Sequence, residues 1–261
     1  MTLLKHELKQ GFKTLAIWTA SIGFLIAICL FLFPEMKGEM DNVSDMFSSM
    51  GSFTAAFGMD RLNFGTLIGF YAVECGNILG LGGAFFASLI AVSALAKEEK
   101  ERTAEFLLSH PVSRVSVISS KLAALVVQIV VMNVVIFALS AACIAIIGEE
   151  PAWKKICLLH LAYFLLQLEL AGICFGLSAF LRRGSLGIGL GIAAMVYFLN
   201  IIANISEKAE FLKFITPFGY VEGADIVSNG SLDGKLILIG MAFALVGVAA
   251  AYFWYSRKDI H

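Results

Sequence analysis

The chain has 261 residues, of which 59% are hydrophobic and 15% are charged, and its formal net charge is −1. Soluble domains average about 45–50% apolar and about 25% charged residues, so this composition favours a membrane protein. The nearly neutral charge argues against nucleic-acid binding, because no basic face is available to neutralise phosphates.

Six long apolar stretches follow one another along the chain. Each approaches the roughly 20 residues that a helix needs to cross the hydrocarbon core, and none alternates as a strand would. We therefore predict an all-α membrane protein with six transmembrane helices in a single transmembrane domain over residues 1–261. The predicted spans are 15–33, 75–96, 122–147, 156–181, 186–205 and 236–255.

Lysine and arginine are unevenly divided between the segments that connect these spans. Twelve of the 19 fall on the side of the N-terminus, in the shorter segments. Because positive charge is enriched on the cytoplasmic side, we expect both termini to be cytoplasmic. The outer segments, 34–74 and 206–235, are longer and partly amphipathic, and they are predicted to hold either short surface helices or ordinary loops.

The connection between the second and third spans, residues 97–118, is rich in charge and is here termed the elbow. Seven of its first nine residues are charged. Glu98 and Arg102 have the i, i+4 spacing that supports a helix, and Pro111 disfavours helical geometry in the residue before it. Ser113 can cap a second helix that leads into the third span.

Apolar residues of the elbow lie among acidic ones. Phe106 and Leu107 are neighbours of Glu99 and Glu105, which is the arrangement of a docking surface with a packed centre and a polar rim. The alternative is a solvated loop whose bases only enforce topology. That alternative explains the bases but not the glutamates, which contribute little to orientation, and the residues alone leave both interpretations open.

The stretch AKEEKERTAEFLLSHPVSRVSVISSKLAAL, residues 96–125, closely resembles the inner loop of ATP-binding-cassette (ABC) type-2 permeases. It has the acid-rich segment, the T-x-E-[FL]-L-L core and the P-V-S-R turn of that loop. LNFGTLIGFYAVE before the second span, ITPFGYV before the sixth and the terminal YSRKDI agree with the family, so the resemblance covers essentially the whole chain.

This resemblance implies an export-type permease subunit of the ABC type-2 fold, driven by a separate ATPase chain that docks on the elbow at residues 97–114. A second permease chain, identical or homologous, is implied as a partner beside the lipid bilayer, and the expected location is a bacterial cytoplasmic membrane. The implied ATPase-coupling residues are Glu98, Glu99, Arg102, Glu105, Phe106, Leu107, Pro111 and Arg114.

The chain itself is not expected to be an enzyme. It has no G-x-x-x-x-G-K-[ST] sequence to cradle a nucleotide phosphate, so ATP and Mg²⁺ are assigned to the partner ATPase. The four histidines lack metal-ligand spacing, and no catalytic, cofactor or metal site is predicted. Ions, peptides, drugs and lipids are all compatible substrates.

Glu169 lies near the middle of the fourth predicted span. A charged residue there costs about 2.5–3.5 kcal/mol on insertion scales and usually faces the bundle. It can be a hydrogen-bonded clamp between helices, a substrate contact or a proton carrier, and the clamp is favoured because intramembrane polar groups commonly join helices. Gln128, Asn133 and Asn77 are its candidate partners.

A proton-coupled secondary transporter or channel using Glu169 is the alternative function. The two halves of the chain do not look alike, as a three-plus-three repeat would require. Such a carrier also needs no docking elbow, so the elbow favours the permease.

Three G-x-x-x-G pairs occur within the predicted spans: Gly76 and Gly80, Gly172 and Gly176, and Gly187 and Gly191. Small residues at this spacing permit close helix packing or mark dimer faces.

Overall fold

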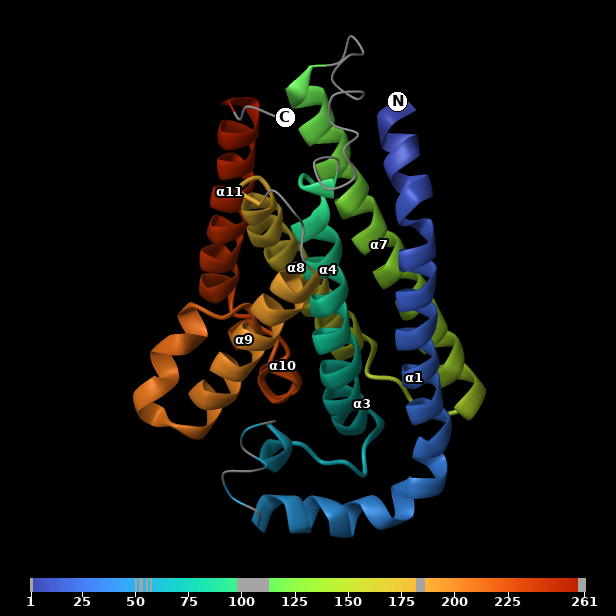
Figure 1. Cartoon of the computed structure of the whole chain (residues 1–261). Helices are drawn as coiled ribbons and strands as arrows, with labels where there is room; N and C mark the ends of the chain where they lie inside the picture. The colour runs from blue at the N-terminus through green and yellow to red at the C-terminus, as the bar shows by residue number, and fades with distance from the viewer. Residues whose placement is uncertain are drawn as a thin grey trace.

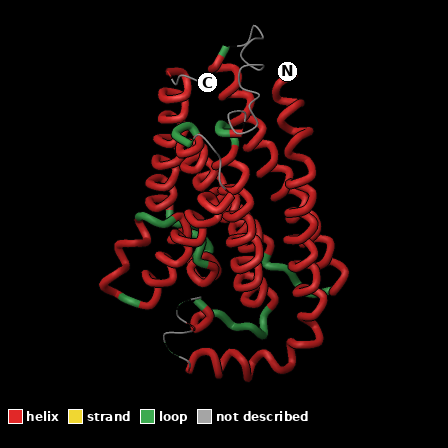
Figure 2. Tube along the Cα trace, in the orientation of Figure 1, coloured by secondary structure: helices red, strands yellow, loops and turns green. Residues whose placement is uncertain are grey.

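The computed structural model describes residues 2–49, 51, 54, 56, 58–97, 113–181 and 186–257. The described part of the chain is built from helices with short connections, and it contains no strand (Figure 2). In chain order, the helices are α1 (Thr2–Ser49), η1 (Met59–Arg61), α3 (Leu67–Cys75), η2 (Gly76–Leu81), α4 (Gly82–Ser93), α7 (Arg114–Ile147), α8 (Trp153–Ser178), α9 (Leu186–Ile205), η3 (Glu207–Phe214), η4 (Pro217–Tyr220), α10 (Gly223–Asn229) and α11 (Gly234–Arg257).

Six helices within the described residues are long and apolar enough to cross a membrane, as the all-α prediction requires. The second of them consists of α3, η2 and α4 in one continuous run over Leu67–Ser93. Figure 1 shows the six side by side, with the start of α1 and the end of α11 at the same end of the bundle. We call this the elbow end, because residues 97 and 114 also lie there, and the other is the opposite end.

The centre of the bundle is formed by α4 and α8, which pack extensively on each other. α1 lies along α7, α11 along α8, and α9 along α4 (Figure 1). In the most apolar windows, 61% of the residues of α8 are buried, against 22% for α1 and 17% for α11. The peripheral helices therefore expose apolar side chains in the way that a lipid-facing surface does.

The second span begins at Leu67, eight residues before the predicted start at Cys75. The residues between them were expected in a surface helix or loop, but Leu67, Phe70 and Tyr71 are buried in the core. Thr66 begins this helix by accepting a hydrogen bond from the backbone amide of Gly69. Tertiary burial thus makes the segment part of the span.

α1 continues beyond the first predicted span and through Pro34 to Ser49. Figure 1 shows that its light-blue part turns and runs across the opposite end of the bundle. A proline inside a helix removes one backbone hydrogen bond and commonly kinks it. Lys37 beyond the proline pairs with Glu149 at 2.8 Å, which ties this part of α1 to the connection between α7 and α8.

α8 and α11 cross with almost no side chain between them. A Cβ atom placed on Gly176 would lie 2.5 Å from the carbonyl oxygen of Gly247, and one on Gly247 would lie 2.5 Å from that of Gly172. The pair Gly172 and Gly176 is therefore a packing site inside one chain. Gly191 has open space where a Cβ would stand.

Candidate functional site

Most of the implied coupling residues lie outside the described residues, so their roles stay predictions. These are Glu98, Glu99, Arg102, Glu105, Phe106, Leu107 and Pro111. The structure does describe both ends of the elbow, at Lys97 and at Ser113 and Arg114.

The exit of the elbow is joined to the last helix. The Ser113 side chain accepts a hydrogen bond from the backbone amide of Ser116 at 3.1 Å, so it caps α7 as predicted. The Arg114 guanidinium donates to the backbone carbonyls of Tyr255 and Ser256, at 3.3 Å each. These carbonyls belong to the last turn of α11, where a positive charge is stabilised by the helix dipole.

The entrance of the elbow is joined to α1. Lys97 donates from Nζ to Oε1 of Gln10 at 2.7 Å. Nearby, the almost fully buried Lys121 of α7 pairs with Glu7 of α1 at 3.0 Å. These side chains and Gln128 line a cavity of about 270 Å³ between α1, α4 and α7. Both helices that flank the elbow are thus connected to the start of the chain.

Glu169 is 1% exposed, and its polar partner comes from outside the six spans. The Tyr220 hydroxyl of η4 donates to Oε2 of Glu169 at 2.9 Å. Burial raises the pKa of Tyr220, and the charge of Glu169 raises it further, so this hydroxyl keeps the proton that it donates. The Glu169 carboxylate also packs against Gly240 of α11, where no room is left for a Cβ.

The residues that were expected to pair with Glu169 contact other groups. Asn133 donates from Nδ2 to Oε1 of Gln167 at 2.6 Å, which joins α7 to α8. Gln128 donates to the backbone carbonyl of Ala124 at 3.2 Å and packs against Gly11 of α1. The pairing of Glu169 with Gln128, Asn133 or Asn77 was wrong because neighbouring polar residues on α8 face different helices.

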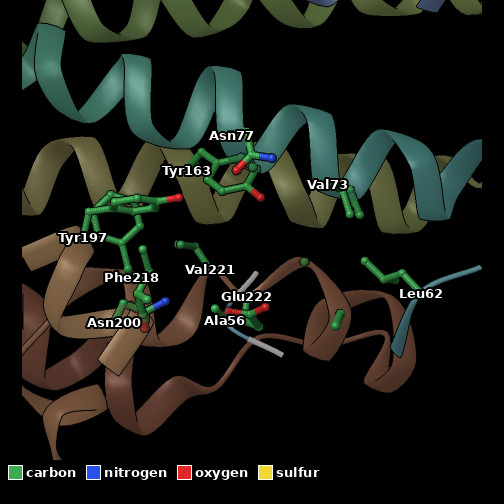
Figure 3. Close-up of a pocket in the computed structure, with 15 residues that line it drawn as sticks. Ala56, Leu62, Val73, Asn77, Tyr163, Tyr197, Asn200, Phe218, Val221 and Glu222 are labelled. Atoms are coloured by element: carbon green, nitrogen blue, oxygen red, sulfur yellow. The ribbon is translucent and has the colours of Figure 1, made fainter. Parts of the chain in front are cut away.

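A small cavity of about 60 Å³, which we call the outer pocket, lies at the opposite end of the bundle. Figure 3 shows polar side chains around it from several directions. Asn77 comes from η2, Tyr163 from α8, Tyr197 and Asn200 from α9, and Glu222 from the residue before α10.

Glu222 is the acidic group of the outer pocket, and its side chain is 11% exposed. Oε2 accepts a hydrogen bond from Asn204 at 3.0 Å, and Oε1 lies 4.0 Å from the Arg61 guanidinium. The carboxylate packs against Gly58, whose φ of +65° is in the left-handed region that favours glycine. Burial raises the pKa of Glu222, while Asn204 and Arg61 oppose that rise.

Sequence reasoning did not find the outer pocket. Its residues lie far apart in the chain, and Glu222 stands in a connecting segment where a carboxylate gives no signal of burial. Two family-like segments were sequence hints: Phe218 and Val221 of ITPFGYV line the cavity, and so do Leu62, Ala72 and Val73 of LNFGTLIGFYAVE. Within the described ranges, no group of three or more His, Cys, Asp or Glu could hold a metal ion.

Comparison with known proteins agrees with the six-helix architecture. The model of a family described as ABC-2 family transporter protein matches residues 1–260. An uncharacterised protein of Bacillus subtilis (strain 168), YhcI, is 23% identical over 216 residues, with 73% of this chain and 68% of the relative covered. The chain is therefore a multi-pass membrane protein that belongs to the ABC-2 transporter family.

Proposed function

We propose that this chain is the permease subunit of an ATP-driven exporter in the bacterial cell membrane, with ATP hydrolysed by a separate ATPase chain that docks on the elbow. The observation that carries the proposal is the family match over residues 1–260, together with the family-like loop within it. ATP and Mg²⁺ would bind to the ATPase, and a second permease chain would complete the pathway.

The contacts at the two ends of the elbow support a coupling role. Arg114, at the exit of the elbow, is hydrogen-bonded to the last turn of α11. Lys97, at the entrance of the elbow, is hydrogen-bonded to α1. A push on the elbow would therefore reach α1 and α11 as well as the two helices that the elbow connects. Packed helices with two alternative arrangements are the kind of element that such a push can bias.

The test is co-purification of the solubilised chain from its native cells, with the associated proteins identified by mass spectrometry. We expect a P-loop ATPase and ATP hydrolysis to elute with the wild type. Glu105→Lys together with Phe106→Asp should abolish both, because the changes reverse a charge and place a carboxylate at the apolar centre of the elbow.

A matched control pair of residues lies at the opposite end of the bundle. Glu210 and Phe211 form the same dipeptide in η3, and Phe211 is 61% exposed. Glu210→Lys together with Phe211→Asp should retain the ATPase. If the correctly inserted wild type brings no ATPase, the permease proposal fails, whereas equal loss in both double variants would contradict docking on the elbow.

A further inference from the structure

The cavity of about 270 Å³ at the elbow end, which we call the inner cavity, has a lining that changes from charged to apolar. Its charged residues all lie outside the predicted spans and are Glu7, Lys97 and Lys121. Its apolar side chains all lie inside those spans and are Leu89, Ile90, Ala94, Ala124, Leu125 and Leu186. The inner cavity therefore lies where the headgroup region of a bilayer meets the hydrocarbon core.

The two ammonium groups of the inner cavity are held next to each other on α1. Lys121 pairs with Glu7 at 3.0 Å, and Lys97 donates to Gln10 at 2.7 Å. Glu7 and Gln10 are three residues apart on α1, and residues at this spacing are neighbours on a helix surface. The packing thus brings one lysine from each side of the elbow to adjacent points on α1.

The charges of the lining favour an anion. Two lysines and one glutamate line the inner cavity, which gives the lining a formal charge of +1. The glutamate is paired with Lys121, whereas Lys97 donates to the neutral amide of Gln10. Glu98 and Glu99 follow Lys97 in the sequence and lie outside the described residues. An ammonium group has three N–H donors, and a phosphate oxygen would accept a stronger, charge-assisted hydrogen bond than the amide does.

The size of the inner cavity suits a headgroup rather than a whole lipid. Its volume of about 270 Å³ is below the roughly 300–1,000 Å³ that drug-sized ligands occupy. Leu186 of α9 lines the cavity and is 54% exposed, so the cavity reaches the apolar outer surface of the bundle. A phosphate can therefore lie inside while its acyl chains lie against the outside of the helices.

We propose that the inner cavity binds the phosphate group of an anionic phospholipid from the cytoplasmic leaflet. Lys97 would donate to the phosphate oxygens, and the Ser93 hydroxyl, which lines the same cavity, can donate as well. Lys121 would add its positive charge from the buried side. The elbow end is expected in the cytoplasm, and basic pockets between helices on that side of a membrane suit the headgroups of anionic lipids.

This site goes beyond the proposed ATPase coupling, because it requires no ATPase. Lys97 is the first residue of the elbow, so a bound phospholipid would attach the entrance of the elbow to the membrane surface. The competing description is a water-filled cavity in which Lys97 contacts only Gln10.

The test is native mass spectrometry of the purified, delipidated chain in a neutral detergent, where no membrane surface potential contributes. The probes are phosphatidylglycerol and phosphatidylethanolamine with the same acyl chains, and glycerol phosphate. We expect one phosphatidylglycerol to bind about tenfold more tightly than phosphatidylethanolamine, because only the former has a net negative charge. It should also raise the melting temperature. An equal rise with glycerol phosphate would overturn the lipid assignment in favour of soluble phosphate.

Three variants locate the site. Lys97→Gln should weaken phosphatidylglycerol binding by about tenfold, because it removes the charged donor. Lys13→Gln is the matched control: Lys13 is exposed on α1 at the same end and does not line the inner cavity, so this variant should bind like wild type. Ser93→Leu fills the cavity without changing the charge, and it keeps the test decisive if Lys97→Gln fails to fold.

The proposal is overturned if the folded wild type binds both lipids equally. Equal weakening by Lys13→Gln and Lys97→Gln would also overturn it, because the attraction would then come from diffuse surface charge. So would folded Lys97→Gln and Ser93→Leu variants that both bind phosphatidylglycerol as tightly as wild type.

Discussion

The two ends of the bundle differ in whether their buried polar groups have hydrogen-bond or ion-pair partners. At the elbow end, buried Lys121 is paired with Glu7. In the outer pocket, Tyr163 and Asn200 present oxygens that no described side chain satisfies. Paired charges fix the relative positions of helices, whereas a buried oxygen without a partner costs free energy of folding. The comparison therefore separates a paired structural connection from a region where buried polar groups weaken the packing.

Removal of the Lys121 partner should produce the largest effect. Glu7→Gln removes the carboxylate that pairs with an ammonium group that is 2% exposed, and breaking a buried pair costs about 3–5 kcal/mol. A strong loss of thermal stability in detergent is expected, while Glu7→Gln with Lys121→Gln should recover part of it. If the Glu7→Gln chain were as stable as wild type, the pair of Lys121 and Glu7 would not be a structural connection at the elbow end.

Tyr220→Phe should have the next largest effect, about 1–3 kcal/mol, because it leaves the buried Glu169 carboxylate without its donor. The measurement is again thermal melting. Tyr252→Phe is the matched control, since Tyr252 shares its hydrogen bond with Ser119 in an exposed contact. Equal destabilisation in both variants would mean that Tyr220 does not hold Glu169.

Glu222→Gln should change the pH dependence of stability more than stability itself. Because burial raises the folded pKa of Glu222, its contribution is fully present below the unfolded pKa of about 4.3 and is lost as pH rises through the folded pKa. Wild type should therefore lose stability over this interval, and the glutamine variant should lose less. If the stability of wild type and of the glutamine variant changed with pH in the same way, the folded pKa of Glu222 would not be raised by burial.

The smallest effect is expected for Lys97→Met, at about 0.5 kcal/mol or less, because Lys97 contacts Gln10 at an exposed position. Thermal melting of this variant gives the stability loss for an exposed contact at the elbow end. That loss should be small beside the loss caused by breaking the buried pair of Lys121. A loss as large as that of Glu7→Gln would show that the entrance of the elbow is also a main structural connection.

Much of the fold was predictable from the sequence, because apolar runs of this length have few alternatives in a bilayer. The fifth span coincides with α9 at Leu186–Ile205. The second span was placed too late, since the glycine and aromatic residues around Phe70 become apolar core only through tertiary packing.

The polar sites were less predictable. Glu169 was recognisable as a carboxylate inside an apolar run, but its partner Tyr220 stands 51 residues later in an outer segment. The outer pocket depends on residues from six helical segments, which are α3, η2, α8, α9, η4 and α10, and on a left-handed Gly58. Such proximity comes from the way helices pack, which periodicity and composition do not encode.

The glycine crossing of α8 and α11 has a mechanical consequence. Where the two backbones touch at Gly176 and Gly247, no side chain can change rotamer to absorb a displacement. Close-packed interiors are stiff and transmit strain. α8 and α11 should therefore move together as one rigid unit. Arg114 is hydrogen-bonded to the end of that unit, at the last turn of α11. A force at the exit of the elbow would reach the middle of the bundle with little loss.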